Sequence, residues 1–237
     1  MLQYFMRKYT LKNKKNSGWL LRLRIAGVDS KIFIAREYGP DFLKTLKTRY
    51  RYFLVKTSLA RKVYVYNGLL NKYAFENFVR RAYSSLLLKN NGFLLHASGV
   101  ICRGKGYIFT GVSGAGKTTA AEASKKYGVV VSDEIIALRK TGGCWTLFGT
   151  PFMGLMKGGG KNKAAVRPRL FFLKQAPKNA LKPVLPEKAW PRLLRNVVLF
   201  KPGKKIAGLT YSFLCASESR VLFFKKTGFW RTLWSAK

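Results

Sequence analysis

The sequence predicts an α/β fold with a mixed sheet and a β-rich N-terminal region. Short apolar runs rich in β-branched and aromatic residues recur in residues 17–67. The hydrophobic period then changes to that of an amphipathic helix in residues 73–88. A glycine-rich turn at residues 111–116 lies between an apolar run and a segment without helix breakers. We therefore expect a β-rich region over residues 1–70 and an α/β domain over residues 71–237, or one continuous domain.

Four strands are expected in the N-terminal region. Residues 19–25 partly alternate apolar and polar side chains, and residues 31–35 form a short apolar run. Residues 52–56 and 62–66 have the same character, and turn residues separate them from their neighbours. These four runs are the reason for predicting that this region is rich in β-structure.

A helix and further strands are expected next. In residues 73–88 (YAFENFVRRAYSSLLL) apolar side chains recur three and four residues apart, and we expect this stripe to pack against the sheet. Residues 129–131 (VVV) predict a central strand that is covered on both faces. Residues 141–143 predict a hairpin turn. Other expected strands are residues 93–102, 107–110, 170–173 and 220–224.

The stretch TGVSGAGKTTA at residues 110–120 follows one of these strands and leads into a predicted helix. It fits the P-loop pattern G-x-x-x-x-G-K-[ST], in which backbone N–H groups surround phosphates, the lysine reaches the terminal phosphates and the hydroxyl binds Mg²⁺. The helix N-terminus adds its partial positive charge. The pattern predicts a site for ATP with Mg²⁺. Its residues are Gly111, Val112, Ser113, Gly114, Ala115, Gly116, Lys117, Thr118 and Thr119.

Two of the nine acidic residues, Asp133 and Glu134, stand side by side after the strand at residues 129–131. A P-loop needs a carboxylate to hold Mg²⁺, and a phosphotransferase can also use one to take the proton from an attacking hydroxyl. Motor ATPases and signalling GTPases normally insert more chain between the P-loop and this carboxylate. The spacing here is therefore typical of a kinase.

The charge of the chain is strongly positive. Lysine and arginine number 46 against 9 acidic residues, which gives a net charge of +37. Residues 1–90 and 151–237 contribute +16 and +17, whereas residues 91–150 contribute +4. Such a chain attracts nucleic acid, anionic lipid or an acidic protein, and a proteome-wide lysine bias is the alternative explanation. For residues 157–163 (KGGGKNK) we hypothesise a flexible loop whose lysines steer an acidic acceptor.

The remaining composition bears on compartment and chemistry. No run of about 18 uncharged apolar residues occurs, so we expect no transmembrane helix, and the N-terminus lacks the apolar core of a secretory signal. The three cysteines have no metal-like spacing and suit a reducing compartment, so we expect a cytoplasmic protein. A single histidine, His96, excludes multi-histidine zinc sites. Nothing in the sequence predicts an oligomeric state.

Four motifs occur in a fixed order: HASGV (residues 96–100), IFTGVSGAGKTT (108–119), VVVSDEIIAL (129–138) and FGTPF (148–152). Together they resemble the catalytic domain of HPr kinase/phosphorylase and its relatives of reduced size. The resemblance implies a variant P-loop on a phosphoenolpyruvate-carboxykinase-like sheet. The motif region spans residues 92–153, and residues 169–183 and the basic, aromatic C-terminus resemble the smaller relatives more loosely.

The resemblance also implies a role for each matching residue. Lys117 would bind the β- and γ-phosphates of ATP, and Thr118 would bind Mg²⁺, with Glu134 as a second carboxylate on the metal side. Asp133 would be the base that deprotonates a protein serine hydroxyl. His96 would lie near the transferred phosphoryl group. The implied activity is ATP-dependent phosphorylation of a serine in a protein or peptide.

Three departures indicate a reduced-size relative rather than a true HPr kinase. Asp133-Glu134 stands where the family has two aspartates, Thr119 stands where it has a glutamate, and residues 157–161 replace its glycine-rich signature. Two other functions stay open. One is a small-molecule kinase of the same fold, and the other is a nucleotide-binding protein associated with a polyanion such as nucleic acid.

Overall fold

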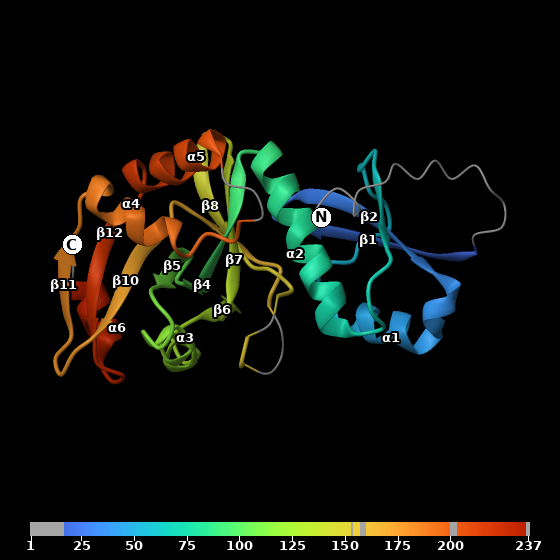
Figure 1. Cartoon of the computed structure of the whole chain (residues 1–237). Coiled ribbons are helices and arrows are strands. Elements are labelled where there is room, and N and C mark those ends of the chain that lie inside the picture. The colour runs from blue at the N-terminus through green and yellow to red at the C-terminus, as the bar shows by residue number, and fades with distance from the viewer. Residues whose placement is uncertain (1–16, 153, 157–159, 200–202, 236–237) are drawn as a thin grey trace.

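The computed structural model describes residues 17–152, 154–156, 160–199 and 203–235. It contains a three-stranded and a nine-stranded sheet. Figure 1 shows the small sheet at one end of the molecule, the large sheet at the other and helix α2 (Lys72–Lys89) between them. The predicted mixed α/β architecture with a β-rich N-terminal part is therefore confirmed. The division of the chain at residue 70 stays a prediction.

The N-terminal part contains one helix that the sequence analysis missed. Strands β1 (Gly18–Ile25) and β2 (Val28–Ala35) form an antiparallel hairpin, and β3 (Val63–Tyr66) pairs with β2 in parallel. Between β2 and β3 the chain forms a short 3-10 helix, η1 (Arg36–Tyr38), and helix α1 (Gly39–Arg49). The strand predicted at residues 52–56 is wrong, because this segment forms a turn with a single isolated bridge between Leu23 and Leu54.

Helix α2 joins the two sheets through one shared core. The Asn71 side chain caps its N-terminus by accepting the backbone N–H of Tyr73. Phe75, Val79 and Tyr83 are fully buried, in the same hydrophobic cluster as residues from both sheets. The Tyr83 hydroxyl also bonds to the carbonyl of Leu23 at 2.9 Å. The predicted apolar stripe thus packs as expected, and it packs on two sheets.

The large sheet has the strand order β11-β12-β10-β5-β4-β7-β8-β9, with β6 also paired to β4. Strands β5, β10 and β12 are parallel to one another, whereas the remaining pairs are antiparallel. The sheet is therefore mixed. Its strands are β4 (Gly92–Cys102), β5 (Lys105–Thr110), β6 (Val129–Ser132), β7 (Ile135–Thr141), β8 (Cys144–Phe148), β9 (Ala164–Val166), β10 (Arg169–Gln175), β11 (Ala180–Pro183) and β12 (Ser219–Phe224).

Helices cover both faces of the parallel part of this sheet (Figure 1). Side chains on β5 alternate: Phe109 packs with α3 (Lys117–Ser124) and α6 (Phe229–Ser235), whereas Ile108 packs with α4 (Pro186–Leu194) and α5 (Lys204–Cys215). This burial on both faces is typical of parallel strands. Among the described residues, no helix combines the length and apolar character that crossing a membrane needs.

Strand β6 differs from the prediction of a central strand. It pairs only with β4, and Val129 and Val130 are half-buried. Strands β6 and β7 lie one after the other along the same side of β4, which pairs with β6 near Gly99–Ile101 and with β7 over residues 92–96. Residues 133–134 form a bend between the two strands, and the register shift of this edge lies just before them, where β6 pairs with Gly99 and Val100. We call residues 133–134, next to this shift, the acidic bulge, and bulges often re-aim side chains beside active sites.

Candidate active site

Residues 111–116, here called the glycine loop, connect the carboxyl end of β5 to the first residue of α3. Gly116 has φ 101° and Gly114 has φ 77°, a left-handed conformation that glycine adopts without strain. A Cβ atom at Gly116 would also lie 2.9 Å from the Phe224 ring. These two glycines allow the loop to turn sharply and place the N-terminus of α3 at the carboxyl edge of the sheet.

The Lys117 side chain folds back over the glycine loop. Its Nζ donates hydrogen bonds to the carbonyl oxygens of Gly111 at 2.9 Å and Val112 at 3.1 Å. Lys117 is buried, and burial lowers the pKa of its ammonium group from the usual value. Within the described residues the ammonium has no carboxylate partner. A positive charge thus lies beside the first N–H groups of α3, where anions bind favourably.

The acidic bulge is held close to the glycine loop by the strand ladder. Ala97 on β4 pairs with Thr110, the last residue of β5, and its N–H donates to the carbonyl of Glu134 at 2.9 Å. Because neighbouring strands are roughly 4.8 Å apart, the backbones at Thr110 and Glu134 lie about 10 Å apart. Side chains from the two segments can therefore act on one small ligand.

Asp133 is buried beneath the segment that follows β8. Its Oδ1 accepts the N–H of Gly154 at 3.1 Å, and its Oδ2 accepts the N–H of Met156 at 2.8 Å. A Cβ atom at residue 154 would lie 2.5 Å from Oδ2, so only glycine permits this close approach. The two backbone donors orient the carboxylate, and each oxygen keeps a second lone pair for a further hydrogen bond.

Glu134 turns toward helix α2, where it joins a group of ionised side chains. Arg80 Nη2 donates to Glu134 Oε1 at 3.0 Å and also pairs with Glu76, which in turn pairs with Arg49. Burial raises the pKa of the Glu134 carboxyl group, and the positive charge of Arg80 opposes this shift. We refer to these four residues as the arginine-glutamate network.

His96 lies between the two halves of the site. It pairs across the ladder with Ile135, directly after the acidic bulge, and its carbonyl accepts the hydroxyl of Thr110. Burial lowers the pKa of its imidazole, and the charges of Lys117 and Arg80 lower it further. The imidazole is therefore neutral near pH 7, and it lies close enough to Lys117 and Arg80 for their charges to act on it.

The structure thus brings together Lys117, His96 and the two acidic residues, while their predicted roles stay predictions. Sequence reasoning missed two participants. Arg80 was visible only as an i,i+4 partner of Glu76. Gln175, at the end of β10, donates to the carbonyl of Gly114 at 2.7 Å, and nothing in the sequence indicated this contact.

The lysine loop hypothesised at residues 157–163 is only partly visible. Lys157 and the next two glycines lie outside the described residues. The Lys161 N–H donates to the carbonyl of Val131 at 3.0 Å, and its Nζ lies 4.8 Å from the centre of the Tyr52 ring. This end of the loop is therefore anchored against β6 and the N-terminal part. A steering role for its lysines stays a prediction.

No protein-family model matches the chain, and no curated protein matches it. Among solved structures, the chain is distantly similar to the Hpr(Ser) kinase/phosphatase from Coxiella burnetii. The two share 14% sequence identity at a TM-score of 0.30, over 52% of this chain and 88% of that chain. A likeness this remote carries no argument about the site, so any function must be argued from the chain's own residues.

Proposed function

We propose that this protein is an ATP-dependent kinase that transfers the γ-phosphate to a hydroxyl group, most simply a serine of a protein or peptide. The observation that carries the proposal is the Lys117 ammonium group. It is buried beside the glycine loop, with carbonyl partners only. A buried charge is costly unless an opposite charge compensates it. An anionic ligand at the N-terminus of α3 supplies that charge.

ATP phosphates fit this position. On binding, Lys117 would exchange the carbonyls of Gly111 and Val112 for phosphate oxygens, which gives stronger charge-assisted hydrogen bonds. The backbone N–H groups of residues 111–119 would surround the same phosphates. The half-buried Thr118 hydroxyl makes no hydrogen bond with other described residues, so it suits a Mg²⁺ ligand. When bound, Mg²⁺ neutralises charge on the β- and γ-phosphates.

Asp133 is the proposed base. It would take the proton of the serine hydroxyl as the serine Oγ forms a bond to the γ-phosphorus. The bond from that phosphorus to the bridging β–γ oxygen breaks, and ADP leaves with its charge held by Lys117. Glu134 would release its ion pair with Arg80 and would then act as a second carboxylate on the Mg²⁺ side. Neutral His96 would donate an N–H to the transferred phosphoryl group.

The nature of the acceptor comes from the family resemblance alone. A finding that free metabolites, and no protein, stimulate ATP turnover would instead favour the small-molecule kinase. We would incubate the purified chain with γ-labelled ATP and either a protein extract or its small-molecule filtrate. Label transferred to protein would support serine as the acceptor if it survives neutral hydroxylamine, which cleaves acyl phosphates, and acid, which cleaves phosphohistidine, but is lost in strong alkali by β-elimination.

Nucleotide binding can be tested without knowing the acceptor. Mg-ATP at roughly 100 times its Kd should stabilise the parent by about 2.7 kcal/mol. Lys117→Ala should lose this stabilisation, because it removes the cation beside the glycine loop. Lys140→Ala is the matched control, since Lys140 is exposed at the end of β7. If melting curves of Lys117→Ala still shift as the parent's do, the glycine loop is not the nucleotide site.

A further inference from the structure

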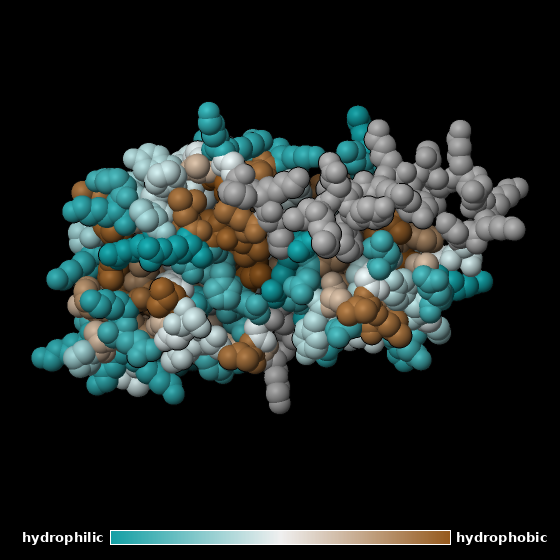
Figure 2. Space-filling view, in the orientation of Figure 1, coloured by the Kyte–Doolittle hydropathy of each residue, from teal (hydrophilic) through white to brown (hydrophobic). Residues whose placement is uncertain are grey.

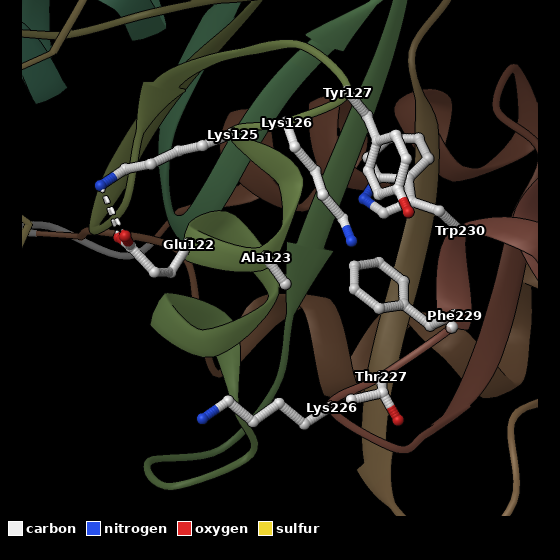
Figure 3. Close-up of a pocket in the computed structure, with 10 residues that line it drawn as sticks. Glu122, Ala123, Lys125, Lys126, Tyr127, Lys226, Thr227, Phe229 and Trp230 are labelled. Atoms are coloured by element: carbon white, nitrogen blue, oxygen red, sulfur yellow. Dashed lines mark hydrogen bonds and ion pairs between the residues drawn. The ribbon is translucent and has the colours of Figure 1, made fainter.

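Outside the candidate active site, a pocket of about 400 Å³ lies between helices α3 and α6. In Figure 3 the Lys126 side chain lies beside the rings of Tyr127 and Phe229, and Lys226 extends from the other side of the pocket. A pocket of this size is in the range that holds a nucleotide-sized group. It is lined by Glu122, Ala123, Lys125, Lys126, Tyr127, Lys226, Thr227, Gly228, Phe229 and Trp230.

The side chains that line the pocket carry more positive than negative charge. Lys126 and Lys226 are exposed, and neither has an acidic partner among the described residues. Glu122 is the one acidic residue in the lining, and it pairs with Lys125 at 2.7 Å (Figure 3). All nine aspartate and glutamate side chains of the chain belong to the described residues, and Glu122 alone among them lines the pocket. Hydrophilic side chains also cover much of this end of the molecule in Figure 2.

Aromatic rings alternate with the cations at this surface. The Arg103 guanidinium lies 4.7 Å from the centre of the Trp234 ring, and Trp234 contacts Tyr127 at 5.2 Å between ring centres. Lys126 Nζ in turn lies 4.9 Å from the Tyr127 ring. Trp234 is 37% exposed, so part of its ring is open to a ligand. We call Arg103, Lys126, Tyr127, Lys226 and Trp234 the basic-aromatic patch.

A separate group of cations and an aromatic ring lies on the other face of the sheet, because Leu222 and Phe224 of β12 point into the core beside α6 and Phe223 points away from it. Lys174 and Lys182, on the two sides of β12, lie 5.6 Å and 5.4 Å from the centre of the Phe223 ring. Asn179 bonds to the N–H of Lys225 and to the carbonyl of Thr227, which brings the turns after β10 and β12 together. Lys174 and Lys182 lie on the opposite face of the sheet from the basic-aromatic patch, so they are not part of it.

From these contacts we propose that the basic-aromatic patch binds single-stranded nucleic acid. Cations that follow a phosphate backbone, with aromatic rings between them for unstacked bases, are the features that such binding needs. An acidic peptide would use only the charges and would leave the rings without a role. A duplex would likewise present phosphates but keep its bases stacked. The patch contains none of the residues proposed for phosphate transfer, so the two proposals stand apart.

The first experiment tests the cations of the patch. It measures the binding constant of a fluorescein-labelled 20-nucleotide oligo(dT) by fluorescence anisotropy at several salt concentrations. The slope of log K against log salt should be about −0.7 for each phosphate contact with a single strand. The full-length triple variant Arg103→Gln, Lys126→Gln and Lys226→Gln should therefore reduce the slope by about 2. The control triple variant replaces Lys44, Lys47 and Lys56, which are exposed in the N-terminal part. An equal loss in both variants would overturn the assignment to this patch.

The second experiment tests the aromatic rings of the patch. It distinguishes single-stranded nucleic acid from other polyanions. Trp234→Ala should weaken oligo(dT) binding by roughly 5- to 100-fold, as expected for one stacked base, and Trp234→Phe should restore most of the affinity. Unlabelled duplex of the same length and a polyglutamate peptide should compete poorly. If either competes as well as oligo(dT), or if Trp234→Ala binds like the parent, the surface is a general polyanion site and the proposal is wrong. Melting temperatures confirm that each variant is folded.

Discussion

The two halves of the candidate active site, the glycine loop and the acidic bulge, are held in place by partners at very different distances along the chain. In the glycine loop, Lys117 bonds to Gly111 and Val112, its near neighbours in sequence. In the acidic bulge, Asp133 depends on the 149–156 segment, and Glu134 depends on Arg80 of α2. One half is held mostly by near neighbours, with Gln175 of β10 as a distant partner of Gly114, and the other is assembled from three parts of the fold.

This difference teaches where each half is vulnerable. A local turn keeps its shape as long as its own glycines and the adjoining strand and helix persist. A carboxylate held by distant partners moves when any of those elements shifts. We therefore expect changes in α2 or in the 149–156 segment to reduce phosphate transfer while nucleotide binding at the glycine loop persists.

The largest expected effect comes from Asp133→Asn. Loss of a general base should lower the rate of phosphate transfer by about 10²–10⁴-fold. Affinity for Mg-ATP, measured by titration calorimetry, should stay within a few-fold of the parent, because the glycine loop is untouched. Glu122→Gln is the control, since Glu122 is exposed on α3. A parallel collapse of ATP affinity in Asp133→Asn would show that the two halves are not independent.

Next in size is Arg80→Leu. It leaves Glu134 and part of Glu76 without a counter-charge, and removal of one partner of a fully buried pair costs about 3–5 kcal/mol. Because Glu76 keeps Arg49, we expect a smaller loss of about 2–3 kcal/mol in urea unfolding. Lys89→Leu, exposed on the same helix, is the control. A loss no greater than that of the control would mean that the network contributes nothing to stability.

Gly116→Ala tests how far the glycine loop depends on packing against a strand that is distant in sequence. The new Cβ would meet the ring of Phe224, far along the chain, and would sit at a positive φ. Together these effects should destabilise the fold by about 1–3 kcal/mol. Gly114→Ala meets open space and should cost about 1 kcal/mol, from backbone strain alone. Equal losses in thermal unfolding would mean that packing on Phe224 does not constrain the loop.

The smallest expected effect is on the pH dependence of stability. The pKa of His96 is lower in the folded protein than in the unfolded chain, so the unfolded chain binds the proton more readily. The contribution of His96 is therefore fully present above the unfolded pKa of about 6.5 and is lost as pH falls below it. His96→Gln should flatten the dependence of the unfolding free energy on pH in this range. Glu134 acts in the opposite direction, because its pKa is raised by burial.

Glu134→Gln tests the opposite pH effects that we expect for Glu134 and His96. A carboxyl group with a raised pKa holds its proton longer in the folded state, so its contribution to stability declines as pH rises above the unfolded value of about 4.5. Removing the charge should therefore lessen the decline between the unfolded pKa and the raised pKa of the folded state. Unfolding by urea at a series of pH values measures both variants. An unchanged profile in both would show that neither group is perturbed by burial.

Features with a local cause were predictable from the sequence. The strand, glycine loop and helix around Lys117 follow from a short apolar run, from glycines at turn positions and from a segment without breakers. The stripe on α2 follows from its period. Helix α1 was missed because the short apolar runs on either side of it suggested strands throughout. In a helix of eleven residues, the recurrence of apolar side chains every three to four positions is a weaker signal than these apolar runs.

By itself, the sequence determined the turn chemistry of residues 111–116, the adjacency of Asp133 and Glu134, and the excess of positive charge. Tertiary structure alone decided that β6 and β7 share one side of β4, so that the two acids lie at the bend between these strands. It also decided which partners hold them, since Arg80 and Gly154 reach the bulge only when α2 and the 149–156 segment pack there. The physical reason is range: backbone preference acts within a few residues, whereas pairing of strands and ions depends on which surfaces burial brings together.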